Sequence, residues 1–159
     1  MPWKLPDSGY QKLNFDAVFV KENNYMGIGL ILFNDASQCG GAQSIHGIAQ
    51  AEALATLAAI KWAKAEAVEN LHLECDCLNI VKAINDSIGS VIWTNNNVIQ
   101  DCRTLLGSFT SWRFTFVYRK SNEVANSLSR RARNSKLDEF WATTFPGWLK
   151  SLIRDRTQR

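Results

Sequence analysis

The sequence predicts an α/β fold in which a mixed β-sheet carries helices on its faces. Two observations predict it. Three successive strand-like segments near the start of the chain, separated by short breaks, indicate an antiparallel meander. Short strand-like runs then alternate with helical patterns, and this β-α-β order indicates parallel crossovers. The 159 residues, 46% of them hydrophobic, suit one globular domain with its own core.

The first half of the chain predicts three strands and a long helix. The strands are expected at residues 12–20, 25–34 and about 40–48. Gly27 and Gly29 interrupt the second strand, which indicates that another backbone approaches it closely. Residues 49–67 are rich in alanine and predict a helix that packs closely on a sheet. Its expected packing stripe consists of Ala51, Leu54, Ala55, Ala58 and Trp62.

The second half predicts two more strands and three helices. The strands are expected at 71–76 and 112–119, and the helices at 77–87, 98–109 and 122–132. The i, i+4 spacing divides the last helix into two faces. The apolar face consists of Val124, Leu128 and Ala132, and the polar face of Asn122, Asn126 and Arg130.

The pattern predicts a single domain over residues 1–159, with a core of about 10–136. The extension over about 137–159 is apolar but interrupted by Pro146 and Gly147, and we expect it to pack back on the body of the domain.

Composition and local charge limit the class of protein. The net charge of +3 says little about partners, but basic residues gather late in the chain, where they form either a phosphate-binding patch or a solvated helix face. The four cysteines show no CxxC pair and no metal-binding spacing with histidine, which indicates a reduced protein. The first residues lack the apolar segment of a signal peptide, and the longest apolar run is too short to span a membrane. We therefore expect an intracellular protein of the nucleus or cytoplasm, not a secreted one.

Three acidic residues are candidates for a functional site, although each has a structural alternative. Asp16 lies in the middle of a strand, where aspartate is depleted, unless it simply faces solvent. Glu52 lies in the first turn of a helix, where the macrodipole favours an acid by about 0.3–1 kcal/mol. Asp76 ends a strand before a helix, a position where aspartate is a common N-cap.

Taken together, the three acids indicate a metal site. If strands 12–20 and 71–76 are parallel neighbours, Asp16 and Asp76 lie side by side, and a helix crossing the sheet brings Glu52 over both. Crowded carboxylates repel one another unless a counter-charge is present. An oxygen-only ligand set without a histidine or cysteine cluster indicates Mg²⁺ or Mn²⁺ rather than zinc.

Five segments in this order resemble one known family. They are KLNFDAVF, AEALATLAAIKWA, LECDCLNIVKAIN, YRKSNEVANSLSRRA and FWATTFPGWLKSLIRD. The chain resembles type 1 ribonuclease H, in particular the compact ribonuclease H-like domains of plant proteins and of plant non-LTR retrotransposon polyproteins. The resemblance implies a three-layer α/β/α fold around a five-stranded mixed sheet of order 3-2-1-4-5, with strand 2 antiparallel, and we expect a monomer.

The resemblance also implies a reaction and its residues. The family hydrolyses the RNA strand of RNA–DNA hybrids with two divalent cations, Mg²⁺ or Mn²⁺, and recognises duplex shape and 2′-hydroxyl groups rather than base sequence. The implied catalytic and metal-binding residues are Asp16, Glu52, Asp76 and Asn126. The implied nucleic-acid contacts are Asn122, Arg119, Lys120, Arg130, Arg131 and Arg133.

The sequence departs from the family pattern at three positions. Asn126 stands where the family has its fourth acid, Ala17 where a glycine is frequent, and Phe116 where many members carry a histidine. An amide oxygen coordinates a hard cation less strongly than a carboxylate, so we expect reduced activity rather than none. Losing the histidine at Phe116 should slow proton transfer or product release further.

Three hypotheses about function follow. The chain is a metal-dependent ribonuclease H with impaired activity, a non-catalytic module of the same fold that binds nucleic acid, or an interaction domain left over from a retroelement. The retention of Asp16, Glu52 and Asp76 favours the first hypothesis, because a protein that only binds needs none of these acids. Asn126 and Phe116 favour the second.

Overall fold

The computed structural model describes residues 3–20, 25–34, 38–46, 51–86, 96–136, 138–142 and 145–157. Its strands are β1 (Gln11–Val20), β2 (Tyr25–Phe33), β3 (Gln38–His46), β4 (Asn70–Cys75), β5 (Ser111–Phe116) and β6 (Glu139–Trp141). Its helices are α1 (Ala51–Ala65), α2 (Leu78–Asn85), α3 (Asn96–Leu106), the short 3₁₀ helix η2 (Arg119–Asn122), α4 (Glu123–Ser135) and α5 (Gly147–Thr157). Every strand and helix expected from the sequence is present, and the ends that the structure describes differ by at most a few residues; the expected ends at residues 47–50 and 87 lie outside the described ranges. Within the described ranges, none of the helices has the length and apolar character that crossing a membrane requires.

The six strands form one mixed sheet of order β5-β4-β1-β2-β3-β6. β2 runs antiparallel to β1 and β3, whereas β4 runs parallel to β1 and β5. This order confirms the expected 3-2-1-4-5 arrangement, but the expected count of five strands is wrong. The additional strand, β6, pairs antiparallel with the edge of β3 and comprises only Glu139–Trp141. Three residues are too few to show an alternating pattern, so the sequence indicated only a segment that packs on the body.

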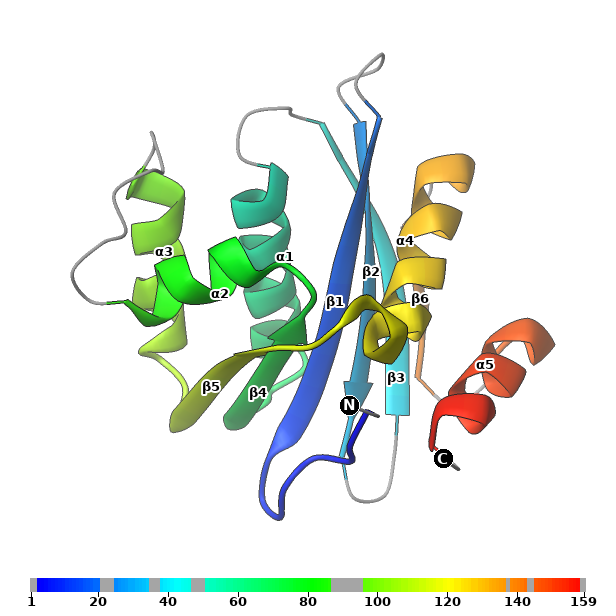
Figure 1. The fold of residues 1–159 in the computed structure, drawn as a ribbon, viewed down its shortest axis with the longest axis horizontal. Coiled ribbons are helices and arrows are strands. Elements are labelled where there is room, and N and C mark those ends of the chain that lie inside the picture. Colours follow the sequence, from blue (N-terminus) through cyan, green and yellow to red (C-terminus); the bar gives the residue numbers. More distant parts are fainter. Residues whose placement is uncertain are drawn as a thin grey trace.

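Two helical layers enclose this sheet, with α1, α2 and α3 on one side and α4 and α5 on the other (Figure 1). Alternate residues of β2 therefore enter two different cores. Met26, Ile28, Leu30 and Leu32 belong to the core beneath α1. Ile31 and Phe33 pack in the opposite direction, with Leu128 of α4 and Leu149 of α5.

Two glycines allow α4 to lie directly on β2. A Cβ atom on Gly29 would collide with the carbonyl oxygen of Ala125 and the amide nitrogen of Ser129. One on Gly27 would collide with the carbonyl oxygen of Ser129. The close approach predicted from these glycines is thus confirmed. Because Gly29 is the register partner of Asp16, the same contact brings α4 beside the central strand at the position of that acid.

The buried face of α1 differs from the predicted stripe. Ala55 and Trp62 are buried as expected, but Ala51, Leu54 and Ala58 are only half-buried. The face that packs instead consists of Ala53, Ala55, Thr56, Ala59, Ile60, Trp62 and Ala63. α1 packs against both the sheet and α3, so these elements bury a large part of its circumference. Small apolar residues therefore occur around most of the helix, and their spacing does not identify a single buried face.

Candidate active site

The three expected acids line one pocket. Asp16 lies on β1, Asp76 directly follows β4, and Glu52 lies in the first turn of α1. β1 and β4 are parallel, and Asn14 pairs with Glu74, so Asp16 and Asp76 each lie two residues beyond that pair. All three acids belong to the wall of a pocket of about 230 Å³. The neighbouring-strand geometry expected from the sequence is therefore present.

The pocket wall combines these acids with one cation and one thiol. Arg119 and Cys77 complete its polar lining, and the thiol of Cys77 donates a hydrogen bond of 3.0 Å to Oε2 of Glu52. Burial and this contact with Glu52 raise the pKa of Cys77 to about 11, so the thiol stays protonated. Cys77, not Asp76, is the N-cap residue of α2 and its side chain makes no capping bond, so the N-cap interpretation of Asp76 is wrong.

Asp16 is the acid whose environment disfavours its charge most clearly. Burial, followed by repulsion from Asp76, raises its pKa from the ordinary 3.8 to about 6. Hydrogen bonds from Asn126 and the amide nitrogen of Ala17, together with the charge of Arg119, oppose this rise. The bond from Nδ2 of Asn126 to Oδ2 of Asp16 is 2.6 Å, and that from the nitrogen of Ala17 to Oδ1 is 2.9 Å. Burial and the neighbouring acid together thus outweigh the donors and the cation around Asp16.

Asn126 contacts Asp16 but is not one of the residues that line the pocket. The residue is 2% exposed, and its Oδ1 accepts a hydrogen bond from the guanidinium of Arg130 one helical turn later. The shared helix face predicted for these two residues is thus confirmed. Phe116, at the position of the family histidine, ends β5 and packs edge-on against the ring of Tyr118 at a centroid distance of 5.2 Å.

The donor set fits a hard divalent cation in its chemistry, because carboxylate oxygens are the ligands that Mg²⁺ and Mn²⁺ prefer. The side chains do not, however, converge on a single point. Among the residues that the structure describes, no three histidine, cysteine, aspartate or glutamate side chains are close enough together to hold a metal ion. The thiol of Cys77 occupies Oε2 of Glu52, so Oε1 is the oxygen that Glu52 could offer to a cation.

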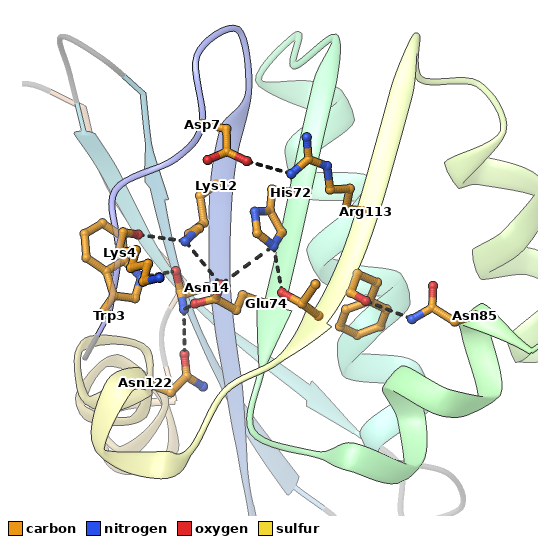
Figure 2. A network of polar contacts seen from close by, with 12 residues as sticks. Trp3, Lys4, Asp7, Lys12, Asn14, His72, Glu74, Asn85, Arg113 and Asn122 are labelled. Carbon is orange, nitrogen blue, oxygen red and sulfur yellow. Dashed lines mark hydrogen bonds and ion pairs between the residues drawn. The ribbon is translucent and has the colours of Figure 1, made fainter. Parts of the chain in front are cut away.

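Asn122, expected from the sequence to contact nucleic acid, is buried in this structure, and its nucleic-acid contact remains a prediction. It is 1% exposed, and its Nδ2 donates a 2.9 Å hydrogen bond to the carbonyl oxygen of Phe15, the residue before Asp16. Its Oδ1 accepts a 3.2 Å bond from Asn14, which also donates a 3.1 Å bond to Glu74 (Figure 2). As folded, the side chain of Asn122 contacts protein atoms and fixes the strand that carries Asp16.

The network around Asn122 contains residues that were not expected from the sequence. Lys12, 4% exposed, forms a 3.2 Å ion pair with Glu74 and donates a 2.7 Å hydrogen bond to the carbonyl oxygen of Lys4. The sequence feature that could have identified them is their spacing. Lys12, Asn14 and Asp16 occupy every second position of one strand, so their side chains lie on the same face of the sheet.

The basic residues predicted to form one cluster have different partners in the structure. Arg119 lines the pocket, and Arg130 contacts Asn126. Arg131 instead makes two hydrogen bonds, of 2.8 and 3.1 Å, with the carboxylate of Glu139 and lies over the rings of two tryptophans of the C-terminal segment. Lys120 is exposed on η2, and Arg133 contacts its neighbour Asn134.

The mixed sheet order, the helical layers and the acids at neighbouring parallel strands define a ribonuclease H-like protein. The chain belongs to the reverse transcriptase-like family, whose model matches residues 14–132, more than half of its length. The plant retrotransposon type expected from the resemblance remains a prediction.

Solved structures agree with this fold. Ribonuclease H1 of the halophilic archaeon Halobacterium salinarum is 23% identical, with a TM-score of 0.66 over 79% of this chain and 98% of that one. An N-terminal ribonuclease H domain from Mycobacterium tuberculosis is 15% identical, with a TM-score of 0.68 over 79% and 94%. LC11 ribonuclease H1, solved in complex with an RNA/DNA hybrid, is 14% identical, with a TM-score of 0.68 over 79% and 98%. No curated protein matches the chain.

Proposed function

We propose that the chain is a ribonuclease H-type domain that hydrolyses the RNA strand of RNA–DNA hybrids with the help of a divalent cation, at a rate that Asn126 reduces. One observation carries this proposal. Asp16, Glu52 and Asp76, from three separate elements, line one pocket together with Arg119. A surface that only binds phosphates gains nothing from three acids, because they repel the ligand. Membership of the reverse transcriptase-like family and the ribonuclease H-like fold support the same reaction.

The chain's own residues divide the work in this proposal. Asp16, Glu52 and Asp76 would hold Mg²⁺ or Mn²⁺. When bound, such a cation polarises a phosphate and lowers the pKa of an attacking water. Arg119, exposed at the pocket wall, contacts a phosphate oxygen of the substrate, and Lys120 beside it contacts a neighbouring phosphate. Asn122 acts from within the protein by holding the carbonyl group next to Asp16.

Two features of the site reduce the expected rate. Asn126 removes one negative charge and donates a hydrogen bond to Asp16 instead of offering an oxygen. Phe116 has no group that transfers a proton, and it packs against Tyr118. The three carboxylates remain available, so the expected outcome is slow cleavage with a raised metal requirement.

A non-catalytic module that binds duplexes is the second candidate. Asn126, Phe116 and the lack of a converged metal cluster among the described side chains favour it. In this function the exposed cations Arg119 and Lys120 would still hold phosphates, and affinity would fall steeply as salt rises.

Cleavage of an end-labelled RNA–DNA hybrid distinguishes these candidates. We expect the native chain to cut the RNA strand in Mn²⁺ or Mg²⁺ and to leave a DNA duplex of the same sequence intact. Asp16→Asn should lower the rate at least about 100-fold, because it removes a carboxylate ligand. A native chain that binds the hybrid in a salt-dependent manner but cleaves it in neither metal would establish the binding module instead.

A further inference from the structure

Asn126 lies between two groups of opposite hydrogen-bonding character. The guanidinium of Arg130 carries only donors, and an ionised carboxylate such as that of Asp16 carries only acceptors. The amide must therefore turn its oxygen to Arg130 and its NH₂ group to Asp16, as the contacts record. The orientation follows from the two partners themselves, so position 126 presents N–H groups, not oxygen, to Asp16.

This orientation excludes a cation shared by residues 16 and 126. A shared cation needs an oxygen from both residues, whereas the NH₂ hydrogens carry positive partial charge. Turning the amide over would direct its oxygen at the carboxylate of Asp16 and its NH₂ group at the guanidinium of Arg130, losing both hydrogen bonds. Asn126 is 2% exposed, so water has little access to replace them.

The backbone that carries Asn126 has little freedom to move, whereas the side chain of Arg130 is exposed. Arg130 follows Asn126 by one turn of α4, and α4 is seated on the glycines of β2 with no space for a side chain between them. Replacing an acid by an amide reduces the negative charge on this side of Asp16, and with it the need for a second cation.

We propose that the chain binds one divalent cation, among Asp16, Glu52 and Asp76, and that Arg130, acting through Asn126, takes the place of the second cation that the family pattern implies. Arg130 is in this sense a positioning residue, because it fixes the amide that donates to Asp16. The inference rests on the proposed function, since the cation in question is that of the proposed nuclease.

Titration with Mn²⁺ in the absence of nucleic acid tests the inference. We expect calorimetry to give one Mn²⁺ per native chain and electron paramagnetic resonance to show an isolated ion. Asn126→Asp alone should still bind one, because the new carboxylate pairs with Arg130 at i, i+4. The double variant Asn126→Asp/Arg130→Gln should bind two, with the spin coupling of ions about 4 Å apart.

Arg133→Gln is the matched control for these titrations, because it removes a guanidinium from the same helix whose contact is with Asn134. It should bind one Mn²⁺, as the native chain does, and circular dichroism should show that each variant is folded. Two coupled ions in the native chain, or one ion in the folded double variant, would overturn the inference. No Mn²⁺ bound to the native chain would overturn both the inference and the proposed metal dependence, whereas one ion without hybrid cleavage would contradict the nuclease alone.

A spectroscopic readout tests the positioning role of Arg130 separately. In metal-free protein the side-chain NH₂ signals of Asn126, identified by their loss in Asn126→Asp, should be protected from exchange. Arg130→Gln should shift these signals and speed their exchange, because the amide loses the donor that holds its oxygen. Unchanged signals in Arg130→Gln would show that Arg130 does not hold the amide and would overturn its role.

Discussion

At the scale of single residues, Asp16 shows how burial and neighbours determine what an acid contributes. The sequence identified this residue because aspartate is uncommon inside a strand. The direction of its pKa shift could not be predicted in the same way, because it depends on burial by distant elements and on Asp76. Asn126 is similar: spacing placed Arg130 on its helix face, but only the packed structure shows that the amide joins Arg130 to Asp16.

The raised pKa of Asp16 predicts how stability depends on pH. The pKa is about 6 in the folded chain and near the ordinary 3.8 when unfolded, so between these values the folded state binds more protons. The contribution of Asp16 to stability is therefore full below about pH 4 and is lost as the pH rises through about 6. The change in unfolding free energy caused by Asp16→Asn should therefore be about 2 kcal/mol more favourable at pH 8 than at pH 4.

Urea unfolding at both pH values, in the presence of a chelator, measures this gain. Asp7→Asn serves as the control, because the pKa of Asp7 is lowered by its hydrogen bond with Arg113 and the variant should gain no stability at pH 8. If Asp16→Asn changes the free energy of unfolding equally at the two pH values, the pKa of Asp16 is not raised in the folded chain.

At the scale of elements, the contact between α4 and β2 connects the fold to the site. Gly29 is opposite Asp16 in the sheet and lies under Ala125, the residue before Asn126. The sequence predicted the close backbone approach at the glycines and the apolar face of α4. Both predictions rest on local signals, namely glycine within a strand and i, i+4 spacing within a helix. It did not predict β6, which is too short, nor the buried face of α1, whose alanines surround the helix.

Gly29→Ala should destabilise the chain through this contact. The added methyl group meets the backbone of α4, which cannot move aside as a flexible side chain would, so we expect a loss of about 3 kcal/mol in the free energy of unfolding. Gly147→Ala is the matched control. Its added methyl group meets nothing within 4 Å, and the change should stay within about 0.5 kcal/mol. Equal urea midpoints for the two variants would show that α4 is not seated on β2 as described.

At the scale of the whole molecule, one buried polar network joins segments that are far apart in the sequence. The N-terminal segment, β1, β4 and η2 meet through Lys12, Glu74, Asn14 and Asn122 (Figure 2). The order of the sheet was predictable from alternation and crossover rules, whereas this network was not. A single polar residue in a strand is compatible with an exposed face. In the structure these residues are buried, in contact with η2 and the N-terminal segment.

Lys12→Met should test how far the network supports the fold. It leaves the carboxylate of Glu74 buried with the imidazole of His72, 3.7 Å away, in place of the ammonium group. Losing one partner of a buried ion pair costs about 3–5 kcal/mol. The double variant Lys12→Met/Glu74→Gln removes the charge as well, and the new amide oxygen still accepts from Asn14, so it should recover most of that loss. Arg113→Gln breaks the exposed pair with Asp7 and should leave the urea midpoint unchanged.

If the double variant is no more stable than Lys12→Met, the loss comes from packing around the Lys12 side chain and not from the unpaired charge. If the double variant recovers the stability, the loss in Lys12→Met comes from breaking the ion pair, which joins β1 and β4 beside Asp16 and Asp76.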